Sequence, residues 1–84
     1  GALLITEDEC YYASPLKIVV KSTVGAGDSM IAGMLFGIEQ GKSIEEAFRY
    51  AVACGTLAVT KEGTQSFSLE EVNQMYEKVV VTKA

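Results

Sequence analysis

The chain has 84 residues, of which 49% are hydrophobic, and its formal net charge at pH 7 is −4. This length allows one domain at most, and a domain this small buries only somewhat more than about 60% of the surface that its unfolded chain exposes. The negative charge and the lack of a basic run argue against a nucleic-acid surface and against attraction to anionic membranes. The longest apolar runs, 30–38 and 51–59, are too short to span a bilayer, so we expect a cytoplasmic protein.

The residue types that are missing or rare narrow the possible chemistry further. Histidine is absent, which removes Ser-His and Cys-His nucleophilic schemes and histidine-based zinc sites. Cys10 and Cys54 stand apart with no CxxC pattern, so buried thiols are expected rather than a disulfide or a metal site. The high hydrophobic content, in a chain that begins without Met inside an apolar run, indicates a piece of a larger domain.

Three short strands are expected in the first twenty residues. Apolar runs at 2–6 and 10–13 flank the acidic break at 7–9, which predicts a hairpin with a solvated turn. The run at 16–20 contains consecutive β-branched residues, which are typical of a strand that is covered on both faces.

Residues 28–40 predict a helix that is buried nearly all round. Large apolar side chains recur at helical spacing, at Ile31, Met34, Leu35 and Ile38. Gly33 and Gly37 form a GxxxG pattern on another side, which predicts close packing on a neighbouring element rather than a membrane dimer. Gly41 follows as a C-terminal cap residue.

Two capping boxes mark the starts of two further helices. Ser43-Ile44-Glu45-Glu46 precedes an apolar pattern that continues to Val59. Ser68-Leu69-Glu70-Glu71 follows a loop at 61–65 and opens a shorter helix. The inward side chains expected in that shorter helix are Leu69, Val72, Tyr76 and Val79. Residues 79–81 predict a last short strand.

The small residues at 53–56 indicate that something approaches this part of the second helix closely. One alternative is the packing of another helix, and the other is the flat face of a nucleotide base. The residues alone favour the packing alternative.

A loop of small residues, Gly25-Ala26-Gly27, leads directly into Asp28 at the start of the first helix. Uncovered N–H groups at a helix N-terminus form an anion site together with the helix dipole. A carboxylate beside such a site needs a task of its own, such as accepting a proton from an attacking hydroxyl group. A tight turn in which Asp28 only caps the helix is the alternative that these residues leave open.

Two common phosphate motifs are excluded by the residues that follow. Position 30 is Met, so the GxGxxG dinucleotide fingerprint is not met, and no Gly-Lys-Ser/Thr sequence of a Walker A loop follows.

The longer string at 22–33, Ser-Thr-Val-Gly-Ala-Gly-Asp-Ser-Met-Ile-Ala-Gly, resembles the C-terminal signature of the phosphofructokinase B branch of ribokinase-like sugar kinases. The resemblance continues through 41–43, 49–51, 57–60 and 61–64, so it covers most of the chain. It implies a C-terminal fragment of the three-layer α/β/α ribokinase-like fold, with residues 1–84 forming a single, incomplete portion of a carbohydrate kinase domain.

The resemblance also implies roles for individual residues. It assigns the anion hole for the ATP phosphate to Gly25, Ala26, Gly27 and Asp28, and it makes Asp28 the catalytic base that meets the substrate hydroxyl group. Val52 stands where ribokinases carry Asn beside the adenine, so an apolar contact is expected there. Val52, Ala53 and Thr56 are accordingly assigned to the adenine side, and no residue is assigned to a metal.

The activity implied is ATP-dependent phosphorylation of a sugar-phosphate hydroxyl group, with ATP, a sugar phosphate and Mg²⁺ as the molecules bound. The sequence of this signature is most similar to that of 1-phosphofructokinases, which implies conversion of fructose 1-phosphate to fructose 1,6-bisphosphate. A tagatose-6-phosphate kinase or another ribokinase-like kinase is the alternative.

A reading of another class is a non-catalytic fragment that keeps the anion or nucleotide site but performs no chemistry. The family's sugar-binding residues, lid and earlier glycine motif lie N-terminal to the part that this chain resembles. The 84 residues alone are therefore expected to be inactive. We expect the enzyme to be a homo-oligomer, and the isolated fragment to self-associate through the apolar helix at 28–40.

Overall fold

The computed structural model describes residues 2–14, 26–60 and 68–83. Its elements, in chain order, are β1 (Ala2–Ile5), β2 (Cys10–Ala13), α1 (Ala26–Glu39), α2 (Ile44–Thr60), α3 (Leu69–Lys78) and β3 (Val81–Lys83). The described residues form an α/β fragment, as predicted, and the hairpin and the helices lie close to their expected bounds. The expected strand at 16–20 and the loop at 61–65 lie outside the described residues.

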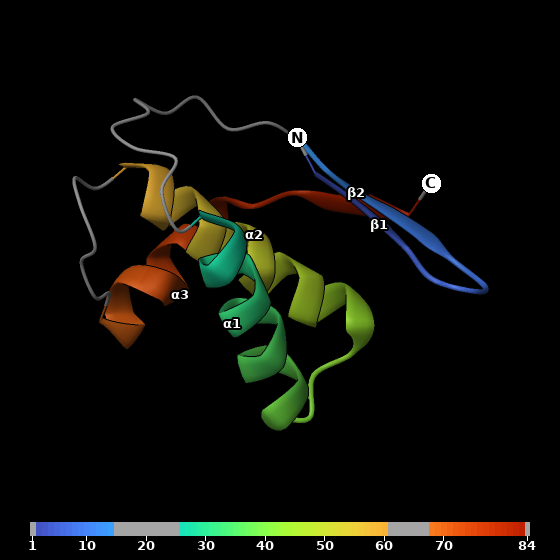
Figure 1. The fold of residues 1–84 in the computed structure, drawn as a ribbon, viewed down its shortest axis with the longest axis horizontal. Helices are drawn as coiled ribbons and strands as arrows, with labels where there is room; N and C mark the ends of the chain where they lie inside the picture. The colour runs from blue at the N-terminus through green and yellow to red at the C-terminus, as the bar shows by residue number, and fades with distance from the viewer. Residues whose placement is uncertain (1, 15–25, 61–67, 84) are drawn as a thin grey trace.

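The strands form an antiparallel sheet in the order β1-β2-β3, so the C-terminal strand returns beside the N-terminal hairpin (Figure 1). Ala13 pairs with Ala2 on one side and with Val81 on the other. The last strand begins at Val81 rather than at Val79, because the Val79 N–H donates to the Tyr76 carbonyl at 3.2 Å and ends α3.

The core lies between the sheet and α2. Its buried residues are Tyr11, Ala13, Phe48, Val52, Ala53 and Val79. Because side chains alternate across a strand, Tyr11 and Ala13 of β2 point toward α2 while Tyr12 points away. The outer face of the hairpin carries apolar side chains that stay in solvent, with Leu3 58% and Ile5 71% exposed.

Helices α1 and α2 lie side by side (Figure 1), and two glycines of α1 lie directly against α2. A Cβ atom at Gly33 would lie 2.6 Å from the carbonyl oxygen of Tyr50, and one at Gly37 would lie 2.7 Å from the Cα atom of Ala47. Neither position therefore has room for a larger side chain. This confirms that the GxxxG pattern serves close packing on a neighbouring helix.

The expectation that the first helix is buried nearly all round is wrong for the described residues. Ile31, Leu35 and Ile38 are 62%, 57% and 48% exposed. The reason is that α2 covers only the side of α1 that carries Gly33 and Gly37.

Both predicted capping boxes are present. The Ser43 hydroxyl accepts from the Glu46 N–H at 3.2 Å, and the Glu46 carboxylate accepts from the Ser43 N–H at 3.2 Å. Ser68 and Glu71 form the same pair of hydrogen bonds at the start of α3. Gly41 has a φ of +75°, so it forms the expected left-handed turn after α1.

The inward side chains predicted for α3 are found with one exception. Val72 is buried and Tyr76 is half-buried, whereas Leu69 is 59% exposed. Leu69 is the first residue of α3, and a helix end has fewer neighbouring side chains to cover it.

Arg49 and three aromatic rings join the helices. The Arg49 Nε–H donates to the Tyr76 carbonyl at 2.9 Å, and its guanidinium carbon lies 4.2 Å from the centre of the Tyr76 ring. The Tyr50 ring lies 4.4 Å from that of Tyr76 and 5.2 Å from that of Phe36. These contacts connect α1, α2 and α3 in sequence.

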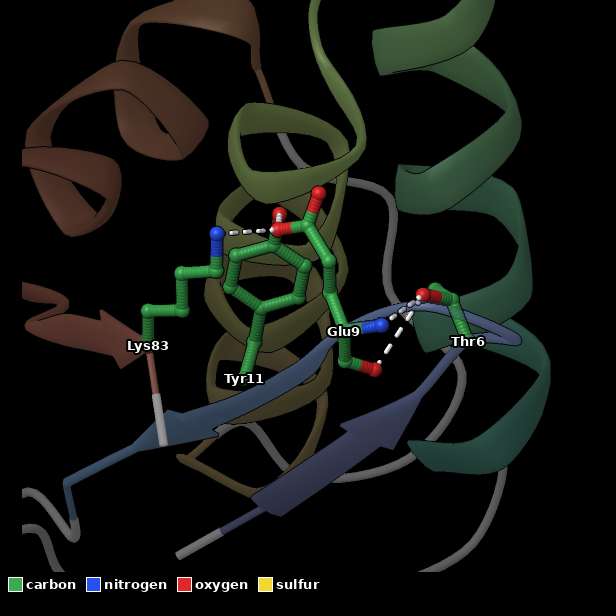
Figure 2. A network of polar contacts seen from close by, with 4 residues as sticks. All are labelled: Thr6, Glu9, Tyr11 and Lys83. Carbon is green, nitrogen blue, oxygen red and sulfur yellow. Dashed lines mark hydrogen bonds and ion pairs between the residues drawn. The ribbon is translucent and has the colours of Figure 1, made fainter.

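A polar network closes the hairpin turn and holds β3 beside it (Figure 2). The Glu9 N–H donates to the Thr6 hydroxyl at 2.9 Å, which closes the turn. The Glu9 carboxylate accepts from the Tyr11 hydroxyl and lies 3.0 Å from the Lys83 ammonium group. The hydrogen bond from Tyr11 and the Lys83 charge lower the pKa of Glu9, and the same bond to Glu9 raises the pKa of Tyr11 to about 12.

Candidate functional site

The predicted anion site lies at the N-terminus of α1. Ala26 is the first residue of α1, and Gly27 and Asp28 follow in its first turn. The N–H groups of a first helical turn have no acceptor within the helix, and the positive end of the helix dipole lies there. Gly25 lies outside the described residues, so the structure brings together three of the four residues assigned to this site.

Gly27 lies in open space. A Cβ atom at this position would meet no heavy atom within 4 Å, and the backbone φ angle of Gly27 is not positive. Neither packing nor backbone strain in the described structure therefore requires glycine at 27. The space that the missing side chain leaves is beside the N–H groups of the first turn of α1, and such a helix N-terminus is a common place for an anion to bind.

Asp28 is exposed beside that space. It is the acidic residue of the first turn of α1, where a negative charge interacts favourably with the helix dipole. A carboxylate in this position can both receive a proton and face a molecule held at the helix N-terminus.

The residues assigned to the adenine side lie on α2 in two different environments. Ala53 has no exposed surface and Val52 is 9% exposed, and both belong to the core beneath the sheet. Thr56 is half-buried. Because Gly33 packs at Tyr50 and Gly37 packs at Ala47, the two helices run in opposite directions. The first turn of α1 is therefore at the same end as Thr56.

The close approach predicted at the small residues 53–56 comes, at Cys54, from α1. A Cβ atom at Gly33 would lie 2.9 Å from the Cys54 Sγ atom. Cys54 and Cys10 are free thiols that are half-buried rather than fully buried. Burial raises the pKa of the Cys54 thiol, which keeps it in its unreactive protonated form.

The described residues contain neither a candidate metal cluster nor a helix that could cross a membrane. Within 2–14, 26–60 and 68–83, no three Asp, Glu, Cys or His side chains gather so that they could hold a metal ion. None of the described helices has the length and hydropathy that crossing a membrane requires.

Comparisons with known proteins show the family of this chain. Residues 1–72 match the model of the pfkB family carbohydrate kinases. The 1-phosphofructokinase of Bacillus subtilis is 41% identical over 85 residues, which cover 99% of this chain and 27% of that protein. The ATP-dependent 6-phosphofructokinase isozyme 2 of Escherichia coli is 36% identical over 76 residues, or 90% of this chain and 25% of that protein.

Solved structures give the same result. A Staphylococcus aureus structure described as a phosphofructokinase superposes with a TM-score of 0.90 at 36% identity, over 100% of this chain and 27% of that one. Phosphofructokinase-2 from Escherichia coli in complex with substrates and products superposes with a TM-score of 0.81 at 35% identity, over 93% and 25% of the two chains. The chain thus spans about a quarter of the length of the relatives it matches, and it belongs to the pfkB family of carbohydrate kinases.

Proposed function

We propose that this chain is the phosphoryl-transfer part of an ATP-dependent sugar-phosphate kinase. The observation that carries the proposal lies in the first turn of α1, where Gly27 leaves space beside the N–H groups of that turn and Asp28 is exposed. Fructose 1-phosphate is the proposed acceptor, because relatives at 35–42% identity are named 1-phosphofructokinases. The product is then fructose 1,6-bisphosphate, and ADP is the leaving group.

In this proposal Asp28 is the base. A sugar hydroxyl oxygen attacks the γ-phosphorus atom of ATP, the bond from that phosphorus to the bridging oxygen breaks, and Asp28 takes the hydroxyl proton. The N–H groups of Gly25, Ala26, Gly27 and Asp28 face the phosphoryl oxygens, where negative charge must be stabilised during transfer. Their effect is large because a helix N-terminus is oriented before the reaction begins.

Mg²⁺ would supply charge neutralisation at the phosphates of ATP. The described residues include no cluster of metal-binding side chains. We therefore assign the ion to the ATP phosphates, to water and to protein outside these residues, and no step above depends on its position.

The adenine ring of ATP is proposed to lie near the end of α2 that is next to the first turn of α1. Thr56 is half-buried at that end, which supports a contact with the nucleotide. Ala53 has no exposed surface, so its part is packing, and Val52 could add only an apolar edge. Formation of a homo-oligomer and self-association of the isolated 84 residues stay predictions.

The test places this chain in a complete relative. The chain replaces the aligned segment of the Bacillus subtilis 1-phosphofructokinase, and turnover is measured with ATP and fructose 1-phosphate. Asp28→Asn should lower kcat by about 10²–10⁴ while KM for ATP changes little, because only the proton acceptor is removed.

Glu39→Gln is the matched control, since Glu39 is an exposed acid at the other end of the same helix. This substitution should leave kcat within about twofold of the unaltered protein. Near-normal turnover of Asp28→Asn, in a chimera whose circular dichroism is unchanged, would refute the assignment of the base.

A further inference from the structure

The Cys54 side chain lies against the backbone of α1 at Gly33. A Cβ atom at Gly33 would lie 2.6 Å from the carbonyl oxygen of Tyr50 and 3.0 Å from the Cα atom of Ala51, which are both backbone atoms. It would lie 2.9 Å from the Cys54 Sγ atom, which belongs to a side chain. The size of the side chain at 54 is therefore what can change the separation of α1 and α2 at this level.

This contact is on the half of α1 that carries Asp28. Gly33 follows Asp28 by five residues, which is a rise of about 7.5 Å along a helix. Toward the other end of α1, Gly37 lies against Ala47, where a Cβ atom would be 2.7 Å from the Cα atom. A larger side chain at 54 would therefore tilt α1 about its contact at Gly37 and move Asp28.

A cavity of about 310 Å³ borders Cys54 between the three helices. Ser29, the residue after Asp28, lines it from α1, and Leu69 and Val72 line it from α3. Protein interiors are closely packed, so a space of this size leaves this side of α1 without close support from α3 in the described part of the chain. The position of the first turn of α1 then depends on α2, and at Gly33 on the Cys54 side chain.

We infer that Cys54 is a positioning residue for the proposed phosphoryl transfer. Its small side chain sets the separation of α1 and α2 at Gly33, and this separation sets where Asp28 stands relative to the sugar hydroxyl group. The inference rests on the proposed function, because it takes Asp28 as the base. A reacting group that is displaced by about 1 Å can lower a rate by about a hundredfold, so even a small tilt of α1 has a measurable effect.

The test is a series of side chains of increasing size at 54, in the chimera with the Bacillus subtilis enzyme. Cys54→Ser, which is nearly the same size, should keep kcat within about twofold. Cys54→Val should lower kcat by about threefold and Cys54→Leu by about tenfold or more, because the added carbon atoms press on the α1 backbone. The KM for fructose 1-phosphate should change by less than about twofold, since a shift of the base acts on the chemical step.

Cys10→Leu is the matched control. Cys10 is the other half-buried free thiol, and it lies on β2. The same substitution there should leave kcat within about twofold. In a chimera that already carries Asp28→Asn, Cys54→Leu should lower kcat by less than about twofold more, because no base is left to position. Circular dichroism and Tm show which variants are folded.

Three results would overturn the inference. In the first, folded Cys54→Leu keeps a normal kcat, even if its Tm is lower, which means that the contact serves only stability. In the second, Cys54→Leu lowers kcat by the same factor with and without Asp28, which means that Cys54 acts on another group. In the third, neither Cys54→Leu nor Cys54→Val folds, which makes the contact part of the fold. Normal turnover of Asp28→Asn alone would refute the base itself, and the proposed function with it, so the two failures are distinct.

Discussion

Two parts of α1 use the same residue type for different purposes. At Gly33 and Gly37 a Cβ atom would meet α2 at 2.6 and 2.7 Å, so glycine is needed for packing. At Gly27 the same atom would meet nothing within 4 Å. Neither packing nor backbone conformation requires glycine at 27, which fits the proposal that an anion binds there. The comparison therefore separates the part of α1 that builds the fold from the part proposed to bind phosphate.

The largest effect expected from this comparison is on stability at the packed glycine. Gly33→Ala should lower the free energy of unfolding by about 2–3 kcal/mol, because the new methyl group meets the backbone of α2 and the helices must move apart. Urea unfolding of the chimera measures the change. A variant as stable as the original protein would show that the contact between α1 and α2 adapts easily.

Gly27→Ala is the matched substitution at the open position. It should change the free energy of unfolding by about 1 kcal/mol or less, since alanine is favoured over glycine within a helix. Gly27→Val should raise KM for ATP or lower kcat by about tenfold or more, because the side chain enters the proposed phosphate space. Nucleotide titrations of folded Gly27→Val that match the original protein would show that this end of α1 is only a turn.

Arg49 provides a third test, on whether α3 is fastened to the pair formed by α1 and α2. Arg49→Met removes the hydrogen bond to the Tyr76 carbonyl and the charge over the Tyr76 ring, so stability should fall by about 1–2 kcal/mol. Arg49→Lys keeps the charge but loses the Nε–H donor, and it should recover only part of the loss. Arg49→Met should leave KM for ATP unchanged, and a clear rise in KM would link the contact between Arg49 and Tyr76 to the proposed ATP site.

The smallest effect expected is a pH dependence at the hairpin, away from α1. The hydrogen bond to Glu9 raises the pKa of Tyr11 to about 12. The stabilisation of the folded state by this bond is therefore present below the ordinary tyrosine pKa near 10 and is lost as the pH rises toward 12. Glu9 has a lowered pKa, so its contribution is present above its ordinary value and is lost as the pH falls through the lowered one.

Glu9→Gln tests this network without touching the proposed site. The substitution should return the titration of Tyr11, followed by phenolate absorbance, toward 10, and it should leave KM for ATP unchanged. An unchanged titration would mean that the Tyr11 hydroxyl does not donate to the Glu9 carboxylate in solution.

Local sequence signals predicted much of this molecule. Ser43 with Glu46 and Ser68 with Glu71 are pairs three residues apart, so their hydrogen bonds form as soon as the helix turns, and both helix starts were predicted correctly. The position of Asp28 in the first turn of α1 was also predicted. Ala26 and Gly27 were expected in the preceding loop, whereas the structure makes them the first two residues of α1, a difference of the size that is common at helix ends.

The sequence by itself determined the helices, their caps and the small residues that allow close packing, because these depend on neighbours within a few residues. Only the tertiary structure decided that Gly27 is open while Gly33 is enclosed, and that Leu35 faces solvent while Val52 is in the core. It also decided that Lys83 meets Glu9 across the sheet. Such contacts depend on strand register and helix docking, which join residues far apart in the chain through many weak interactions, and no local pattern records them.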